Sequence, residues 1–254
     1  MTTAPERADV AAVLFDYGGT LVTFHRPDAA LDAAFAGIER LLRDRGQAPP
    51  PSRVLLTDVH DRVENAFAAH QRSGRLEEIN LAAEARHAYA DLGLELDDEL
   101  LDEVLHMEQE AWWQGVTVDP EAVPTLDALR SRGLRVGLCS NAPYRVRSMH
   151  DQLAHFGLDG HLDSVTFSGQ VGWRKPSPRI FQAATEALGV AAARTVMVGD
   201  SLSDDVDGAR NAGMQAVWLR RGTDAHVGPS SASPISTIDR LSALTFLLFG
   251  TAAL

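Results

Sequence analysis

The hydrophobic positions of this 254-residue chain follow two different patterns. Short continuous apolar runs are typical of parallel strands buried on both faces, and they occur at residues 10–15, 134–139, 165–167, 195–198 and 216–219. Helical patterns separate the later runs, at residues 123–132, 145–156, 178–188 and 205–211. Because strand and helix alternate from about residue 120 onward, we predict a doubly wound parallel α/β sheet.

Residues 24–115 carry the second pattern, in which apolar side chains recur every three or four positions. This period is that of amphipathic helices, and it appears in four sets: Leu31, Phe35, Ile38 and Leu42; Val59, Val63 and Phe67; Leu81, Ala85, Ala88 and Leu92; and Leu100, Val104, Met107 and Ala111. We therefore predict a four-helix domain at 24–115, inserted into a core formed by 1–23 and 116–254. A loop at 228–234 and a closing helix at 238–249 complete the prediction.

Composition and charge narrow the function classes. The formal net charge of −12 disfavours nucleic acid and anionic membranes as partners, since both select a basic surface. No apolar run reaches the roughly 18 residues that span a bilayer, and the first residues lack the apolar stretch of a secretory signal. The single cysteine, Cys139, excludes an internal disulfide and a cysteine-based zinc site. We expect a cytoplasmic protein and an inert, buried thiol.

Polar groups follow the predicted strands, at the edge where open α/β sheets place their sites. Asp16 ends the first strand, Ser140-Asn141 the second and Asp200 the fourth, with Asp204 and Asp205 close behind. The carboxylates of Asp16 and Asp200 suit Mg²⁺. A carboxylate can also be a covalent nucleophile in aspartyl-phosphate chemistry. The Ser140 hydroxyl and the Asn141 backbone N–H are candidates for binding phosphoryl oxygens.

The only lysine of the chain, Lys175, precedes a predicted helix. All other side-chain cations are arginines, so a lysine kept at this position indicates a site that needs a compact ammonium group. Lys175 would neutralise charge on the nucleophile and on the phosphoryl group. Asp205 would support either this lysine or the waters of a metal ion.

Four motifs, in order, resemble those of the haloacid dehalogenase-like hydrolase superfamily: VLFDYGGTL at 13–21, LCSN at 138–141, RKPSPRIF at 174–181 and VGDSLSDDVDGARNAG at 198–213. The resemblance covers nearly the whole chain. It implies a Rossmann-like core, a helical cap, Asp16 as nucleophile, and Ser140 and Lys175 as phosphate-binding residues. It also implies Mg²⁺ bound by Asp16, Asp200 and the backbone carbonyl of residue 18.

Gly18 departs from the family pattern, because the family's phosphatases carry a second aspartate at this position as general acid and base. General acid–base catalysis contributes about 10²–10⁴-fold. Its loss matters least for acyl or aryl phosphates, whose leaving groups need little protonation. Four residues are candidates for a substitute acid: His25, Asp28, Glu77 and Glu78.

The favoured interpretation is a magnesium-dependent phosphatase of a small phosphorylated metabolite, acting as a monomer or homodimer. A phosphonatase-like enzyme would need a lysine in the cap, which contains none. A dehalogenase-like enzyme would need no metal, whereas Asp200 and Asp205 suit a cation. A binding or regulatory protein that has kept the fold without turnover is the alternative outside enzymes.

Overall fold

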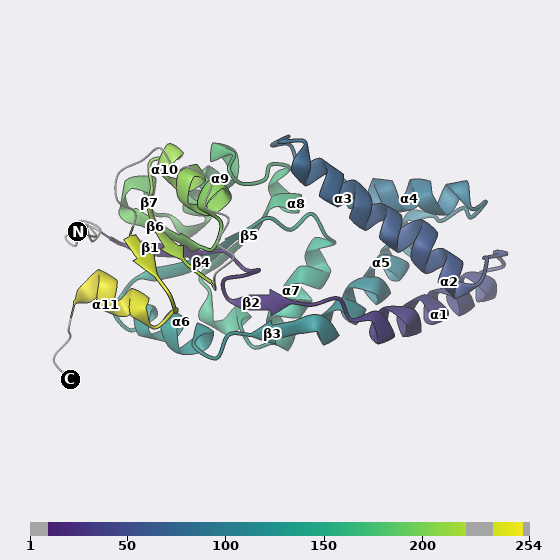
Figure 1. The fold of residues 1–254 in the computed structure, drawn as a ribbon, viewed down its shortest axis with the longest axis horizontal. Coiled ribbons are helices and arrows are strands. Elements are labelled where there is room, and N and C mark those ends of the chain that lie inside the picture. The colour runs from purple at the N-terminus through teal and green to yellow at the C-terminus, as the bar shows by residue number, and fades with distance from the viewer. Residues whose placement is uncertain (1–9, 222–235, 251–254) are drawn as a thin grey trace. The chain divides into compact units, whose positions relative to one another are not determined.

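A computed structural model describes residues 10–221 and 236–250 (Figure 1), so the predicted loop at 228–234 lies outside the described residues. The chain divides into two compact units. The first unit contains residues up to 23, 117–142 and from 153 onward, and the second contains 24–116 and 143–152.

The first unit is built on a six-stranded sheet of order β5-β4-β1-β6-β7-β8, in which every neighbouring pair is parallel. The strands are β1 (Ala12–Phe15), β4 (Arg135–Ser140), β5 (Ser164–Phe167), β6 (Thr195–Gly199), β7 (Gln215–Leu219) and β8 (Ser236–Ile238). From β1 the chain adds β4 and then β5 on one side of the sheet. It then returns to place β6 on the other side of β1, and β7 and β8 follow outward from β6. This reversal confirms the predicted doubly wound, Rossmann-like α/β sheet.

Helices cover both faces of this sheet (Figure 1). They are α6 (Ala122–Arg130), α8 (Ser168–Val171), α9 (Pro178–Leu188), α10 (Gly208–Asn211) and α11 (Ala243–Phe249), and α11 packs against α6. Helix α9 begins where the Ser177 side chain accepts from the backbone N–H of Arg179, and Pro178 holds the first helical position. Short 3₁₀ turns lie at Trp113–Gly115, Asp159–His161 and Ala192–Arg194.

Two predicted helices differ from the observed ones. The helix predicted at 205–211 begins earlier, with a π-helical turn at Leu202–Asp207. Ser201 caps the start of this turn, because its side chain accepts a hydrogen bond from the backbone N–H of Asp204. The closing helix predicted from residue 238 begins at Ala243, because Ser236–Ile238 instead forms β8 and pairs with the end of β7. With Ile238 as its single apolar residue, this three-residue strand shows no strand pattern, so periodicity did not predict it.

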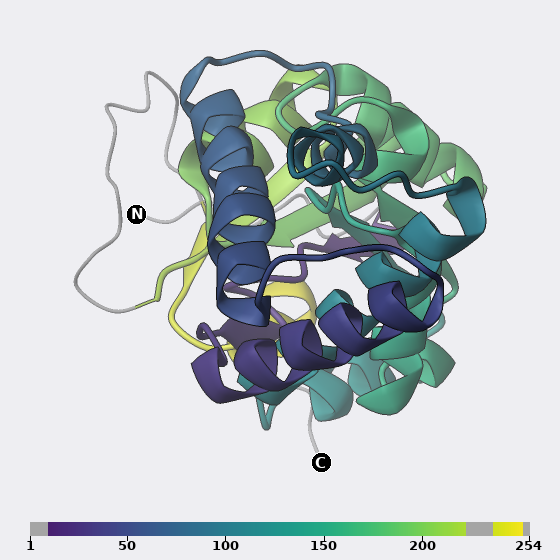
Figure 2. The same cartoon turned by 90° about the vertical axis from the view of Figure 1, so that its right-hand side faces the viewer.

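The second unit is a helical bundle, which Figure 2 turns toward the reader with α1 in purple. Its helices are α1 (Asp28–Asp44), α2 (Ser52–Leu55), α3 (Arg62–Arg72), α4 (Leu81–Asp91) and α5 (Asp98–Trp112), with a π-helical turn at Leu56–Asp61 joining α2 to α3. The apolar positions of the predicted period form the core of the bundle, including the fully buried Phe35, Ile38 and Leu42. The helical segment from α2 to α3 extends further along the chain than the predicted periodic positions Val59, Val63 and Phe67 indicated.

Strands β2 (Val22–Phe24) and β3 (Val116–Val118) form a two-stranded sheet at two of the places where the chain passes between the units. Helix α7 (Val146–His155) begins within the second unit. Arg145 forms an ion pair with Asp102 of α5. The hydroxyl oxygen of Ser148 lies 3.0 Å from Nδ1 of His106. These polar contacts attach residues 143–152, which the sequence pattern places in the core, to the second unit. In the described part of the chain, no helix is long and apolar enough to cross a membrane.

Ionisable side chains lie inside this bundle. His60 is fully buried, and its Nδ1 is 2.6 Å from Oε1 of Glu108. Burial raises the pKa of the nearby Glu64; the charge of His60 opposes this effect and the charge of Glu108 adds to it. Ionising Glu64 at neutral pH therefore costs more free energy in the folded protein than in the unfolded chain.

Replacing Glu64 by glutamine tests this cost. A carboxyl group whose pKa is raised on folding binds its proton more tightly in the folded state, so the free energy of unfolding falls as the pH rises. We expect Glu64→Gln to have little effect at pH 4, below the pKa of about 4.3 of an unperturbed glutamate, and to stabilise the protein at pH 8. Urea unfolding at both pH values measures the difference. Glu84→Gln in α4 is the matched control, and parallel pH profiles for the Glu64 variant and the original protein would contradict the prediction.

Candidate active site

The register of the sheet brings the predicted strand ends together. Phe15 of β1 lies beside Leu138 of β4 on one side and Val198 of β6 on the other. Because the three strands are parallel, the residues that follow them emerge at one edge. Asp16, Ser140 and Asp200 therefore lie at the same end of the sheet, where ligand sites of doubly wound folds occur.

Lys175 is the centre of this cluster. Its Nζ donates to Oδ1 of Asp16 and to Oδ1 of Asp205, both at 2.6 Å. The lysine is 3% exposed, Asp205 is 1% exposed and Asp16 is 8% exposed, so the three charges lie almost completely out of water. Two carboxylates around one ammonium leave a net negative charge in a buried place, which favours a further cation nearby.

Electrostatics keep this lysine charged. Burial alone would lower the pKa of Lys175, but the charges of Asp16 and Asp205 outweigh it and raise the pKa well above its usual range. Burial raises the pKa of Asp205, as does the charge of Asp16, while Lys175 opposes both. The ammonium is thus a permanent positive charge against the Asp16 carboxylate.

Ser140 and Asn141 have different surroundings. The Ser140 hydroxyl donates to Oδ1 of Asp16 at 2.9 Å, so it touches the candidate nucleophile directly. The Asn141 amide instead binds the backbone of Lys175: its Oδ1 accepts from the Lys175 N–H at 2.7 Å and its Nδ2 donates to the Lys175 carbonyl at 3.2 Å. The Asn141 side chain therefore positions the loop that carries the lysine.

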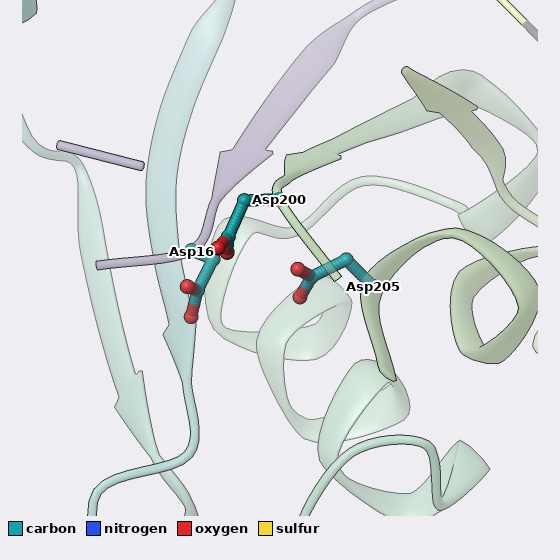
Figure 3. A group of neighbouring side chains, drawn as sticks. All are labelled: Asp16, Asp200 and Asp205. Atoms are coloured by element: carbon teal, nitrogen blue, oxygen red, sulfur yellow. The ribbon is translucent and has the colours of Figure 1, made fainter. Parts of the chain in front are cut away.

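Asp16, Asp200 and Asp205 form the metal candidate (Figure 3). Each offers a carboxylate oxygen within 4.8 Å of the others. Asp16 follows β1, Asp200 follows β6, and Asp205 lies on the next helical turn with its carboxylate directed toward the other two. Burial raises the pKa of Asp200, and the charge of Asp16 raises it further, which is the repulsion a bound cation would relieve. Hard oxygen donors at this spacing fit Mg²⁺.

Both oxygens of Asp205 already have partners. Oδ1 accepts from Lys175, and Oδ2 accepts from the Ser201 N–H at 2.9 Å. Of the two roles that the sequence left open for Asp205, this arrangement favours support of the lysine. A Cβ on Gly199 would lie 2.1 Å from Oδ2 of Asp205, so only glycine fits at that strand end.

The turn after Asp16 also depends on glycine. Gly19 has φ +76°, and a Cβ there would lie 2.3 Å from Oδ2 of Asp200. Gly18 forms a bridge with Val22 and lies outside the left-handed region. Residue 18 is a glycine, so it offers only its backbone to the site.

One residue near the site has no counterpart among the residues predicted from the sequence. Arg221, just after β7, donates from Nη2 to the carbonyl of Thr20 at 2.7 Å and from Nε to that of Gly19 at 3.3 Å, and it pairs with Asp119. It thereby holds the turn that follows the nucleophile. No motif marks it, because an isolated arginine some 200 residues from its partner has no sequence signature.

The remaining candidates belong to other parts of the fold. The predicted substitutes for the missing acid, His25, Asp28, Glu77 and Glu78, are all residues of the second unit. Cys139 is completely buried in β4, and burial raises the pKa of its thiol to about 12, which agrees with an inert cysteine.

Comparison with known proteins gives a family match. A family model described as haloacid dehalogenase-like hydrolase matches residues 10–213. A solved structure, a HAD phosphatase from Thermococcus onnurineus, is 28% identical and covers 95% of this chain and 99% of its own, with a TM-score of 0.57.

Curated relatives include phosphatases. The chain is 44% identical over 103 residues to a phosphoserine phosphatase of Thermus thermophilus, covering 41% of each protein. It is 29% identical over 241 residues to a plasmid-encoded phosphoglycolate phosphatase of Cupriavidus necator, covering 93% of this chain and 92% of the relative. Several other matches are partial, so the chain spans about half the length of those curated relatives.

Removing the ammonium tests the charge balance of the cluster. We expect Lys175→Met to lower the free energy of unfolding by about 3–5 kcal/mol at pH 7, because two buried carboxylates lose their cation. Arg179→Met is the control: this exposed arginine stacks on the Trp173 ring, a contact that at exposed sites is worth about 0.5–1 kcal/mol. Urea unfolding measures both variants, and equal losses would show that the buried cation contributes no more than the surface one.

Proposed function

Because the chain belongs to the haloacid dehalogenase-like hydrolase family, we propose that it is a magnesium-dependent phosphatase that hydrolyses a small phosphorylated metabolite through a phosphoryl group carried on Asp16. The observation that carries the proposal is the Asp16 carboxylate held between the Lys175 ammonium and the Ser140 hydroxyl. The phosphatases among the relatives support this substrate class.

The reaction proceeds in two displacements. A carboxylate oxygen of Asp16 attacks phosphorus, the bond from phosphorus to the ester oxygen breaks, and the leaving oxygen takes up a proton. Water then attacks the aspartyl-phosphate, releasing inorganic phosphate and restoring the carboxylate. Lys175 and Ser140 orient the attacking group, and the ammonium stabilises the charge that gathers on the phosphoryl oxygens.

The residues that would hold the metal ion are Asp16, Asp200 and the backbone carbonyl of Gly18, with Asp205 acting through Lys175. When bound, Mg²⁺ supplies positive charge that lowers the repulsion between the carboxylate and the phosphoryl oxygens. Arg221 contributes by holding the Gly19 and Thr20 carbonyls, so the turn keeps one shape.

Gly18 sets the substrate range within this mechanism. Without a carboxyl group at this position, protonation of the leaving oxygen depends on water or on another residue. We therefore propose that acyl and aryl phosphates are turned over better than alkyl phosphates. The second unit takes the role of substrate selection in this proposal. The oligomeric state, monomer or homodimer, and the cytoplasmic location stay predictions.

The decisive experiment measures phosphate release from a panel of small phosphate esters, with Mg²⁺ and with a chelator. We expect activity that needs the metal and falls by at least about 10³-fold in Asp16→Asn, because the nucleophile is lost. Asp200→Asn should raise the Mg²⁺ concentration needed for half-maximal activity. Asp207→Asn, in the same helical turn as Asp205 but outside the cluster, should behave as the original protein.

Two results would count against the proposal. Phosphate release that persists in Asp16→Asn would remove the nucleophile from the mechanism. Release of halide from 2-haloacids by the chelated protein, with no phosphate released from any ester, would indicate dehalogenation instead.

Restoring the missing acid gives a second test. The backbone of Gly18 is outside the left-handed region, so an aspartate is compatible with its φ angle. We expect Gly18→Asp to raise kcat for alkyl phosphates by about 10²-fold or more, the lower range of general acid catalysis, and to change kcat for aryl phosphates much less. Equal changes for both ester classes would argue that another group already donates the proton.

A further inference from the structure

Asp200 differs from the other two carboxylates of the metal candidate. Asp16 and Asp205 are buried, and each accepts a hydrogen bond from Nζ of Lys175, whereas Asp200 is exposed. Within residues 10–221 and 236–250, no other side chain donates a hydrogen bond to the Asp200 carboxylate. The position of this carboxylate therefore depends on the Asp200 backbone and on the groups that pack against it.

Trp218 of β7 holds that backbone. Strand β7 lies beside β6, and Trp218 is paired with Gly199, the last residue of β6. The indole Nε1 of Trp218 donates to the backbone carbonyl of Asp200 at 3.0 Å. An indole has this one donor and no acceptor, so its polar capacity is used entirely at Asp200. A side chain of the neighbouring strand thus fixes the first residue after β6.

The turn that follows Asp16 packs against the side chain of Asp200. A Cβ on Gly19 would lie 2.3 Å from Oδ2 of Asp200, so the turn backbone is in direct contact with this carboxylate. The Gly19 N–H donates to the Val22 carbonyl at 2.7 Å. Because N–H and C=O point in opposite directions in a trans peptide, this bond also fixes the direction of the Gly18 carbonyl, the backbone group expected to bind the metal ion.

Arg221 fixes the next two carbonyls of the same turn. Its Nη2 donates to the Thr20 carbonyl at 2.7 Å, and its Nε donates to the Gly19 carbonyl at 3.3 Å. A planar guanidinium can hold both carbonyls at once, which a lysine ammonium cannot do in the same way. Asp119 forms an ion pair with Arg221, and its backbone N–H donates to the Leu21 carbonyl at 2.9 Å. The arginine is therefore itself anchored.

A guanidinium close to a metal site has two effects of opposite sign. Burial and the charge of Asp16 raise the pKa of Asp200, and the charge of Arg221 opposes them, so this charge acts at Asp200. A positive charge repels a divalent cation, whereas a fixed turn presents metal ligands that are already in place. Because the two effects change metal affinity in opposite directions, the loss of Arg221 shows which one is larger.

We infer that Trp218 and Arg221 are positioning residues for the divalent cation, because they hold Asp200 and the turn at Gly18–Thr20 in place before the ion binds. This inference rests on the metal site of the proposed function and adds two residues to it. Both lie outside the four motifs of the sequence. Both belong to the first unit, as do the groups that they hold.

Mg²⁺ binding to the full chain, measured by titration calorimetry, tests this role without an activity assay. Trp218→Phe keeps an aromatic ring and loses the N–H, and Arg221→Met loses both donors. We expect each variant to raise the Kd for Mg²⁺ by about 10-fold, as for other groups that orient metal ligands. Trp113→Phe in the second unit and Arg220→Met are the matched controls, since Arg220 pairs with Asp239. Both controls should bind Mg²⁺ as the original protein does.

Two further measurements separate positioning from general structural support. Arg221→Lys keeps the charge without the planar pair of donors, so its Kd should stay close to that of Arg221→Met. The indole N–H signal of Trp218 in NMR spectra should shift during the Mg²⁺ titration, with the midpoint that calorimetry gives. Thermal unfolding in the presence of a chelator verifies that every variant is folded.

Several results would overturn the inference. An unchanged Kd in Trp218→Phe or in Arg221→Met removes that residue from the role, and an indole signal that ignores Mg²⁺ also removes Trp218. Tighter binding by Arg221→Met would show that repulsion by its charge is the larger effect. Full recovery in Arg221→Lys would show that the paired donors are not required. Absence of Mg²⁺ binding by the original protein would overturn the role of both residues.

Failure of the proposed function looks different. If the original protein binds Mg²⁺ and releases no phosphate from any ester, the phosphatase assignment fails while the positioning role stands. If phosphate release needs Mg²⁺ but both variants keep the original Kd, the positioning role fails and the phosphatase assignment stands.

Discussion

The buried ammonium of Lys175 is the interaction on which the rest of the site depends. Asp16 and Asp205 come from different strand ends and would repel each other if no cation lay between them. The lysine donates to both at 2.6 Å and thereby fixes the position of the candidate nucleophile. The cost of desolvating three charges is offset only by close contact of opposite signs. Asn141 supports this contact, because its side-chain amide binds both the backbone N–H and the backbone carbonyl of Lys175.

The sheet and the cluster could be predicted because their signals are local. A continuous apolar run marks a doubly buried strand, and parallel strands necessarily end at one edge. Hence the order of strands and polar residues along the chain is enough to group Asp16, Ser140 and Asp200, and the four motifs locate Lys175 in the same place. The helical period at positions such as Phe35 and Ile38 likewise predicts the bundle, whose core these side chains form.

Other features depend on contacts that sequence spacing does not encode. Arg221 binds carbonyls some 200 residues away, and β8 is a strand only because β7 offers it an edge. The assignment of residues 143–152 to the second unit follows from Arg145 meeting Asp102, a long-range ion pair between ordinary surface residue types. The choice between a metal role and a lysine-supporting role for Asp205 needed the positions of its two oxygens.

The solitary lysine has a consequence for chemical labelling. Its side-chain amine is the only one in the sequence, and it is 3% exposed. An acylating reagent finds no accessible ε-amine on the folded protein, although arginines are abundant. Modification of this one amine therefore reports the opening of the candidate active site, and the extent of acylation over time measures how often that site is exposed to solvent.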